Sequence, residues 1–326
     1  MNRRDFLTKS GAAVSLGLLA RGALSAQTTS GQATPAGSTG SPPAAPVPIQ
    51  APTPVTEFRP LRGNVGCFTG RGGTIGWLSS AEALVAVDTQ FPDTAAIFLK
   101  DMPGRNGRLL DAVINTHHHG DHTGGNGIFK PVTKTIVAHA NVPDLMLVAA
   151  KRNPGAPAPT LPDATFPASW SHDFGGEPAT ARYFRPAHTS GDIVVHFEKA
   201  NVVHTGDLMF NRIYPVVDRA AGGRFKGWLT TLEELVQTYP ADAIYIFGHG
   251  NAKFGITGGH ADMRAFRDYI AALLAHVEKE IKAGRTKEEI VKLENFPGFP
   301  DLHVPPGPGN RLGGNLGVAY DELTSG

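Results

Sequence analysis

Four histidines and one aspartate stand close together in the 326-residue sequence, directly after an apolar run: His117, His118, His119, Asp121 and His122. Imidazole nitrogens and carboxylate oxygens bind zinc and other first-row metals. In an extended chain alternate side chains point the same way, so His117 and His119 are expected on one side and His118 on the other. Because glycine in this stretch lets the chain turn back, the pattern predicts two groups of metal ligands side by side.

Four more residues of these types flank apolar, strand-like runs elsewhere in the chain. His188 precedes such a run, whereas Asp88, Asp207 and His249 each come just after the end of one. Residues at strand ends are held rigidly by the sheet behind them. A histidine-rich tract alone is often an adventitious metal binder, but the additional His and Asp residues favour a built metal site.

The string HHHGDHTGG at residues 117–125 resembles the H-x-H-x-D-H signature of the metallo-β-lactamase superfamily. It is close to the string of the glyoxalase-II-like hydrolases in that superfamily. His188, Asp207 and His249 follow in the family's order, and the resemblance extends over about residues 60–255. It implies an α/β fold, a four-layer αββα sandwich of two mixed sheets with helices outside, in a single domain.

The resemblance also implies that seven of these side chains bind two divalent metal ions. The first ion is expected to bind to His117, His119 and His188. The second is expected to bind to Asp121, His122 and His249. Asp207 is expected to bridge the two ions. Zinc is the expected metal, with iron and manganese as alternatives because imidazole and carboxylate suit all three. Asp88 is expected behind the ligands, where it would orient one of them.

This ligand set implies a metal-dependent hydrolase. In such sites a hydroxide that bridges two metal ions attacks the scissile carbonyl, and Asp121 would orient it and accept its proton. The expected substrate is a small molecule with an ester, lactone, thioester or amide bond. Asp207 stands where cysteine-bearing metallo-β-lactamases have their cysteine, and this favours chemistry of the glyoxalase-II or lactonase kind.

Three alternatives stay open at this point: hydrolysis of β-lactam amides, an iron oxidoreductase of the sulfur dioxygenase type, and a metal carrier without catalysis. The oxygenase type binds one iron through two histidines and one aspartate, so it does not account for His122, Asp207 and His249 together. A carrier does not account for Asp121 and the bridging carboxylate. Neither the substrate nor the oligomeric state follows from the sequence.

The segment after Asp207 leaves a metal ligand and is therefore expected to border the substrate pocket. Phe210 and Tyr214 are candidates for an apolar wall there, and Arg212 is a candidate for contact with an anionic group. The alternative is that the two aromatic rings belong to the core. The glycine-rich loop at residues 70–73 is expected to overhang the site from the other side.

The composition fits a globular enzyme and excludes other classes of protein. Lys and Arg number 30 against 29 Asp and Glu, for a net charge of +1, so no binding of nucleic acid by bulk charge is expected. Hydrophobic residues make up 41% of the chain, which is enough for a folded core. The single cysteine excludes an intrachain disulfide.

Residues 1–26 are expected to be a cleaved export signal. The pair Arg3 and Arg4 precedes a short apolar run and small residues, a pattern that resembles a twin-arginine signal. The run is shorter than the roughly 20 residues that a membrane span needs, although an uncleaved anchor is the alternative. The protein is therefore expected in the periplasm or secreted, after contact with the twin-arginine export machinery and without a stable membrane span. Residues 27–54, rich in Pro, Ser and Gly, are expected to form a disordered linker.

Residues 55–326 are expected to form the folded domain. Strand-like runs come first in meanders and then alternate with helical runs, a pattern typical of α/β proteins. Apolar periodicity predicts strands at 65–68, 74–78, 83–87, 109–114, 134–138, 179–184, 193–197, 201–204 and 243–247. It predicts helices at 94–102, 142–151, 228–239, 263–281 and 287–293, of which the last two close the chain.

Overall fold

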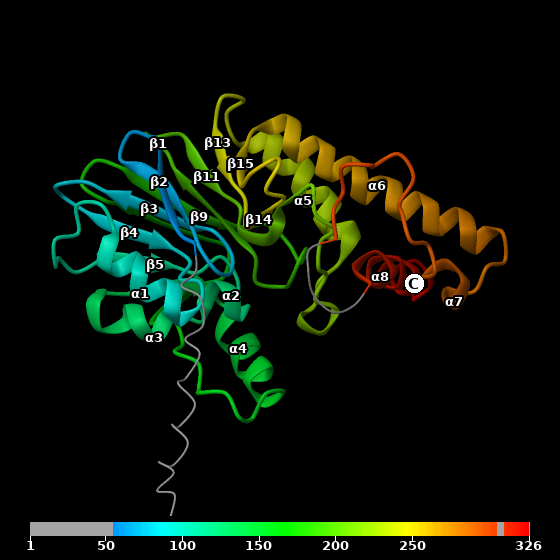
Figure 1. Ribbon diagram of the computed structural model, residues 1–326, viewed down its shortest axis with the longest axis horizontal. Coiled ribbons are helices and arrows are strands. Elements are labelled where there is room, and N and C mark those ends of the chain that lie inside the picture. Colours follow the sequence, from blue (N-terminus) through cyan, green and yellow to red (C-terminus); the bar gives the residue numbers. More distant parts are fainter. Residues whose placement is uncertain (1–54, 305–309, 326) are drawn as a thin grey trace, which may run out of the picture. The chain divides into compact units, whose positions relative to one another are not determined.

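Two β-sheets packed face to face, with helices on their outer faces, make up the part of the chain that the computed structural model describes (Figure 1). That part comprises residues 55–304 and 310–325. The expected export signal, 1–26, and the expected linker, 27–54, lie outside the described residues.

The first sheet has seven strands in the order β1-β2-β3-β4-β5-β6-β7. Its strands are β1 Glu57–Arg62, β2 Val65–Thr69, β3 Ile75–Ser79, β4 Leu84–Val87, β5 Ala112–Ile114, β6 Ile136–His139 and β7 Ala164–Phe166. The first four form an antiparallel meander, and β4 to β7 run parallel to one another. The carboxyl ends of β4 and β5 therefore meet at one edge, where Asp88 and the histidine cluster follow them.

The second sheet has six strands in the order β15-β13-β11-β10-β9-β8. Its strands are β8 Ser169–Asp173, β9 Pro178–Tyr183, β10 Ile193–Phe197, β11 Val202–His204, β13 Ile244–Ile246 and β15 Thr257–Gly258. The parallel pairing of β11 with β13 brings their carboxyl ends together. Beyond those ends, β12 (Phe210–Asn211) pairs with β14 (His249–Gly250), which places the segment after Asp207 beside His249.

Helices form the two outer layers and the chain's C-terminal part. They are α1 Pro92–Asp101, α2 Gly120–Thr123, α3 Asn126–Phe129, α4 Val142–Lys151, α5 Phe225–Thr238, α6 His260–Lys282, α7 Lys287–Ile290 and α8 Arg311–Thr324. Short 3-10 turns are η1 Lys130–Val132, η2 Gly206–Leu208 and η3 Arg219–Ala221. None of the helices in the described ranges combines the length and the apolar character needed to cross a bilayer.

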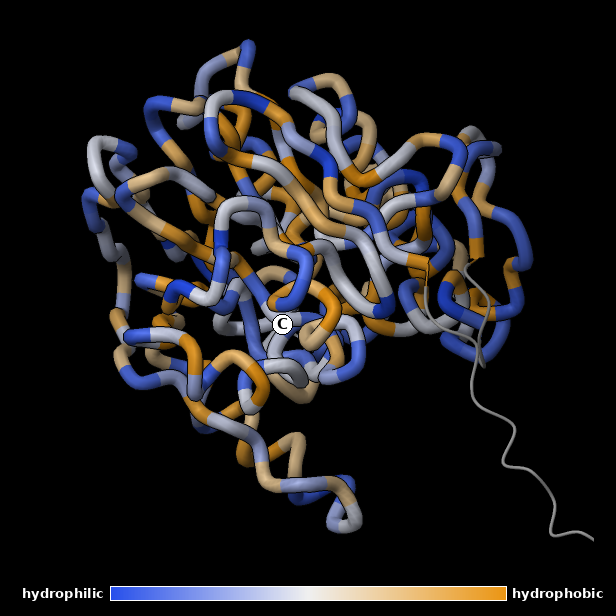
Figure 2. The backbone as a smooth tube through the Cα atoms, turned by 60° about the vertical axis from the view of Figure 1, so that its left-hand side comes forward, coloured by the Kyte–Doolittle hydropathy of each residue, from blue (hydrophilic) through white to orange (hydrophobic). Residues whose placement is uncertain are grey.

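Four apolar clusters hold these layers together, and three of them are large. Between the sheets lie inward-facing side chains such as Val85 and Val195, both fully buried. Phe98 of α1 packs on the outer face of the first sheet, and Trp228 of α5 and Phe266 of α6 pack on the outer face of the second. Figure 2 shows hydrophobic stretches of the chain running through the interior and mostly hydrophilic residues at the outer turns. The predicted αββα sandwich is thus confirmed.

Most of the predicted elements are present, with ends that shift by a few residues, but several observed elements were not predicted: the strands β1, β7, β8, β12, β14 and β15, the short helices α2 and α3 and the 3-10 turns, and α8, which follows the two helices that were expected to close the chain. The edge strands β1 and β8 contain no fully buried residue, so they lack the apolar alternation of a buried strand. Helix α8 contains three glycines, which lower intrinsic helix propensity. Its first turn is capped by Asn310, whose side chain accepts a hydrogen bond from the Gly313 amide. Packing against α6 and α7 stabilises α8 in spite of those glycines.

Candidate metal centre

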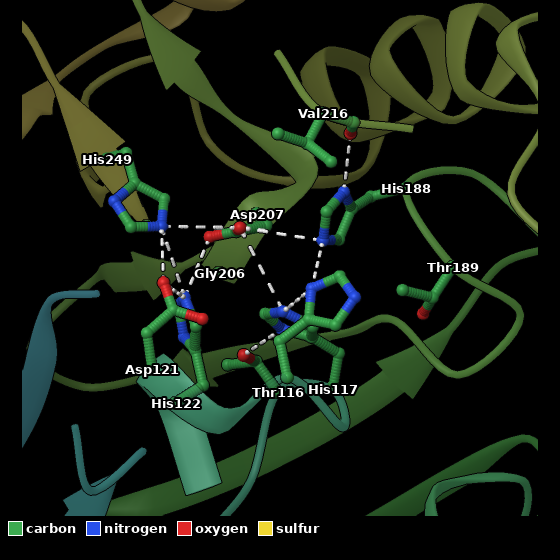
Figure 3. A network of polar contacts seen from close by, with 12 residues as sticks. Thr116, His117, Asp121, His122, His188, Thr189, Gly206, Asp207, Val216 and His249 are labelled. Atoms are coloured by element: carbon green, nitrogen blue, oxygen red, sulfur yellow. Dashed lines mark hydrogen bonds and ion pairs between the residues drawn. The ribbon is translucent and has the colours of Figure 1, made fainter. Parts of the chain in front are cut away.

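Loops at one edge of both sheets bring the predicted ligands together (Figure 3). The first sheet contributes His117 and His119 just after β5, and Asp121 and His122 in the short helix α2. The second sheet contributes three more loops: His188 lies before β10, Asp207 lies in η2 after β11, and His249 begins β14 after β13. The site therefore depends on the packing of the two sheets.

One group of four side chains surrounds a single point. The Nδ1 atom of His119 lies 3.1 Å from His117 Nε2 and 2.9 Å from His188 Nε2. Asp207 Oδ2 lies 3.5 Å from His188 Nε2 and 3.9 Å from His117 Nε2. All four ligand atoms lie within 4.8 Å of one another.

A second group lies on the other side of Asp207. His249 Nε2 is 3.1 Å from Asp121 Oδ2 and 3.4 Å from His122 Nε2. Asp207 Oδ1 lies 3.0 Å from His122 Nε2, and Asp207 Oδ2 lies 3.4 Å from His249 Nε2. The buried Asp207 carboxylate thus stands between the two groups and contacts both.

The nitrogens that face away from the centre are held by hydrogen-bond acceptors. His117 Nδ1 is 3.1 Å from Thr116 Oγ1, and His188 Nδ1 donates to the Val216 carbonyl at 2.7 Å. His119 Nε2 donates to an aspartate carboxylate at 3.1 Å, and His122 Nδ1 donates to another at 2.7 Å. Because a neutral imidazole has one N–H, a neutral ring that donates it outward keeps a lone pair on its inward nitrogen.

This donor set fits divalent metal ions. Four ligand atoms about 2.0–2.1 Å from a zinc ion, at the corners of a tetrahedron, lie about 3.3 Å apart. The observed separations of 2.9 to 3.9 Å in the first group bracket that spacing. Asp207 Oδ1 is buried and lies 3.0 Å from His122 Nε2. Burial opposes a charged His122, but the carboxylates of Asp207, Asp121 and Asp88 raise the pKa of His122 well above its ordinary value, so a cation, either a proton or a metal ion, lies between this ring nitrogen and Asp207 Oδ1.

The outer carboxylate behind His122 belongs to Asp88. Its Oδ1 accepts from the Thr116 amide and its Oδ2 from Thr116 Oγ1, each at 2.7 Å, in addition to the bond from His122. Asp88 is fully buried, with a left-handed backbone φ of 68° at the end of β4. Its carboxylate therefore fixes the orientation of a ligand ring and of the turn that carries the histidine cluster.

Electrostatics divides the histidines into two kinds. Burial lowers the pKa of His117 and that of His188, the latter to about 4, so these rings are neutral and ready to bind a metal. Burial also acts on His249, but the carboxylates of Asp207 and Asp121 outweigh it and raise the pKa of His249 to about 9. When no metal ion is bound, a proton on His249 therefore takes its place. A metal ion and a proton compete for this ring.

A cavity of about 280 Å³ opens onto both groups. Besides ligand residues it is lined by Phe210, Ile213, Val216 and Arg311. The Phe210 ring stacks on His249 with centroids 5.3 Å apart.

Two of the three pocket candidates lie elsewhere. Arg212 is 3.9 Å from Asp262 and lies over the Phe254 ring, and it lines a different cavity, beside α6. Tyr214 is buried in the core, where its hydroxyl accepts from the Phe296 amide. Sequence reasoning missed Ile213, Val216 and Arg311. Ile213 lies in the segment already singled out and Val216 lies just after its end, whereas no motif marks Arg311.

His118 is turned away from the two groups. Its ring is buried, and its Nε2 lies 3.7 Å from Asp218, a residue that sequence reasoning did not single out. The loop at residues 70–73 lies directly against the second group, where the Gly73 amide donates to the Asp121 carbonyl at 3.0 Å.

Comparison with known protein sequences identifies relatives of this chain. Residues 83–249, half of the chain, match the Metallo-beta-lactamase superfamily. Hydroxyacylglutathione hydrolase from Methylococcus capsulatus is 30% identical over 203 residues, which cover 59% of this chain and 69% of that protein. The protein of the same name from Rhizobium meliloti is 28% identical over 188 residues, which cover 55% of this chain and 63% of that protein.

Solved structures share the fold. The stereoselective inverting sec-alkylsulfatase from Pseudomonas sp. superimposes with a TM-score of 0.62 at 16% identity, covering 83% of this chain and 50% of that chain. A metallo-beta-lactamase from Pontibacter korlensis gives a TM-score of 0.55 at 18% identity, covering 67% of this chain and 99% of that chain. At these identities the likeness concerns the fold alone.

The chain belongs to the metallo-β-lactamase superfamily, because the sequence match covers half of it. The sandwich fold and the two groups of His and Asp side chains agree with this assignment. Within that superfamily it is a metal-dependent hydrolase, distantly similar to the hydroxyacylglutathione hydrolases.

Proposed function

We propose that this protein hydrolyses an acyl bond of a small molecule, an ester, thioester or lactone, at two divalent metal ions, with zinc as the expected ion. One observation carries the proposal. The buried Asp207 carboxylate lies 3.5 Å from His188 in one group and 3.0 Å from His122 in the other. A carboxylate shared in this way suits two ions that lie close together.

Two sets of residues would hold the ions, with Asp207 shared between them. The sets are His117, His119 and His188, and Asp121, His122 and His249. When bound, the ions supply Lewis acidity toward the scissile carbonyl and lower the pKa of water so that it becomes a nucleophile near neutral pH.

The protein's own groups do the remaining work. Asp121 is partly exposed at the cavity, so its carboxylate can orient the attacking water and accept its proton. Burial opposes ionisation of Asp121, but the neighbouring His122 and His249 hold its pKa below the ordinary value. Phe210, stacked on His249, lines one side of the site with an apolar ring.

The relatives found by sequence comparison are named hydroxyacylglutathione hydrolases, and this name supports a thioester as the bond that is cleaved. Hydroxyacylglutathione hydrolases match more than half of this chain, and the superfamily match at residues 83–249 contains the candidate ligands. Asp207 in place of a cysteine further supports ester, thioester and lactone substrates over β-lactams. The described cavity, about 280 Å³, is at the small end of ligand sites, which suits a small acyl group.

Elemental analysis combined with a hydrolysis panel tests the proposal. The protein purified without its first 54 residues is expected to carry two zinc ions per chain and to cleave members of a panel of aryl esters, thioesters and lactones. Removal of the metal with a chelator should abolish turnover, and added zinc should restore it. A single iron per chain with consumption of oxygen would instead favour the dioxygenase alternative, and faster turnover of β-lactams than of esters would favour the β-lactamase alternative.

We also propose that residues 1–26 direct export through the twin-arginine route. The support is the Arg3-Arg4 pair before a short apolar run. The double substitution Arg3→Lys and Arg4→Lys is expected to leave the full-length protein in the cytoplasm. Fractionation that still finds the double variant in the periplasm would overturn this assignment.

A further inference from the structure

One cation faces the metal centre from the far end of the chain. Arg311 is the first residue of α8, and it lines the cavity together with Asp121, Asp207 and the ligand histidines. It is the one Lys or Arg among the residues that line this cavity. Its Nη1 donates to the Tyr214 carbonyl at 3.2 Å, which holds the guanidinium at the cavity wall.

Within the part of the chain that the structure describes, the charge of Arg311 forms no ion pair of its own. No carboxylate of the described residues lies within 4.0 Å of its guanidinium, although Asp207 and Asp121 are near enough to act on it electrostatically. Both of those carboxylates belong to the candidate ligand groups. Asp88 and Asp218 lie behind the ligand histidines, so four carboxylates balance the charge of two divalent ions. The guanidinium of Arg311 adds positive charge at the cavity wall beyond that balance.

The hydrogen bond to Tyr214 does not by itself account for an arginine at this position. Guanidinium carries five N–H donors in a planar fork, and this bond uses one of them. The fork matches a carboxylate, which accepts two parallel hydrogen bonds. Because Arg311 is partly exposed in the cavity, its other donors are accessible to a bound molecule.

Apolar side chains complete the cavity. Phe210, Ile213 and Val216 line it beside the ligand groups. A molecule that satisfies all parts of this cavity has an acyl bond at the metal centre, an apolar body, and a negative charge that reaches Arg311. We propose that Arg311 binds a carboxylate on the substrate, so that the site acts on anionic acyl esters or thioesters. This inference rests on the proposed function.

Matched substrate pairs test it. Each pair consists of the 4-nitrophenyl monoester of a dicarboxylic acid of four to six carbons and the 4-nitrophenyl ester of the monocarboxylic acid of the same length. The zinc-loaded protein is expected to give the higher kcat/KM with the anionic member of a pair. Arg311→Gln should lower the ratio of anionic to neutral kcat/KM by about tenfold to a hundredfold, mainly through KM, because a hydrogen bond to a charged group is lost. Arg311→Lys should restore part of the ratio.

The matched control is Arg264→Gln. Arg264 is an exposed arginine of α6 that does not line the cavity, and its removal changes the net charge by the same amount. The ratio should stay at the wild-type value in this variant. A ratio that falls equally in both variants would show that net charge, and not Arg311, selects the anion.

A binding measurement separates this inference from the proposed function. Calorimetric titration of the zinc-loaded protein compares adipate with hexanoate, which differ by the second carboxylate. The wild type is expected to bind adipate more tightly, by about tenfold or more, and Arg311→Gln to lose that difference. Equal binding of the two acids by the wild type, or an unchanged difference in a folded Arg311→Gln, overturns the role of Arg311. Absence of turnover with both esters, together with an Arg311-dependent preference for adipate, contradicts the hydrolase proposal alone.

Discussion

His119 donates from Nε2 to the Asp218 carboxylate at 3.1 Å while its Nδ1 faces the nitrogens of two other candidate ligands. Asp218 is itself fixed, because its other carboxylate oxygen accepts from the Ala221 amide at 3.0 Å. The Asp218 amide donates to the His188 carbonyl, also at 3.0 Å. One residue thus sets the ring orientation of His119 and the backbone position of His188, on two different loops.

Replacing Asp218 should weaken the first metal group. Asp218→Asn retains an oxygen that can accept from the Ala221 amide but removes the negative charge opposite His119 Nε2. Outer carboxylates of this kind typically contribute about 10–100-fold to metal affinity. We expect a loss of that size in zinc affinity, measured by competition with a chromophoric chelator. Asp242→Asn, which removes an exposed surface carboxylate, serves as the control.

A merely structural role for Asp218 gives a different result. In that case the melting temperature of the metal-free protein would fall, while the zinc affinity of the folded variant would match the wild type.

Asp121 is expected to act in proton transfer as well as in metal binding. Its Oδ2 lies 3.1 Å from His249 Nε2, and it lines the cavity. Asp121→Asn should lower kcat by about 10²–10⁴-fold, because a positioned general base contributes that much. The fold should persist, since the side chain is at the cavity and not in the core. Asp144→Asn, an exposed position of α4, is the control.

Three measurements on one preparation interpret the Asp121 result: metal content, melting temperature and kcat. Full turnover with two bound ions in Asp121→Asn would remove Asp121 from the mechanism. Loss of one ion with a matching loss of turnover would restrict its role to metal binding.

Gly73 allows the loop at residues 70–73 to contact the second group. A Cβ atom at this position would lie closer than 3.0 Å to ring atoms of His122, a distance that real Cβ atoms do not tolerate. Gly73→Ala should therefore displace the His122 ring, weaken one of two metal positions and lower kcat. The control is Gly155→Ala, where an added Cβ meets no atom within 4 Å. If Gly73→Ala binds two ions with wild-type affinity, the added methyl group displaces the loop at residues 70–73 and not the His122 ring.

The sequence predicted the sandwich because each layer leaves a local signature. Buried strands such as β4 are continuous apolar runs, and α6 buries residues three or four apart, including Met263, Phe266 and Ile270. The candidate ligands were predictable for another reason, since each follows or precedes such a strand in a short, specific motif.

The pocket wall was less predictable because it depends on a local change of backbone direction. Arg212 has a left-handed φ of 57°, which ends the extended run of β12. The next residue, Ile213, lines the cavity, and Tyr214 enters the core. Arg311 and Asp218 reach the site only through tertiary packing, and no motif near either residue records that packing.

His204 links the two sheets behind the bridging carboxylate. Its Nε2 donates to the Thr74 carbonyl and its Nδ1 accepts from the Gly206 amide, each at 3.1 Å. Both ring nitrogens are thus satisfied only in the neutral tautomer with a proton on Nε2. Burial lowers the pKa of His204 to about 4, against the opposing effect of the Asp88 and Asp207 carboxylates.

This arrangement predicts how stability depends on pH. The pKa of His204 is about 4 in the folded protein and 6.5 in an unfolded chain. As the pH falls below 6.5 the unfolded state binds a proton that the native state does not, so the native state loses stability until the pH reaches the folded pKa. The slope from one such group approaches about 1.4 kcal/mol per pH unit. His204→Gln lacks this group and should lack this part of the pH dependence.

The measurement is urea unfolding of the metal-free wild type and of metal-free His204→Gln between pH 7.5 and 4.5. Chelation in both samples keeps metal release out of the comparison, and the other titrating groups cancel in the difference. We expect the wild type to exceed the variant most in unfolding free energy at pH 7.5, because the variant keeps fewer of the bonds to Thr74 and Gly206. The excess should shrink steadily below pH 6.5. An excess that stays constant down to pH 4.5 would mean that His204 accepts a proton in the folded protein without cost, and that its contacts tolerate the charged ring.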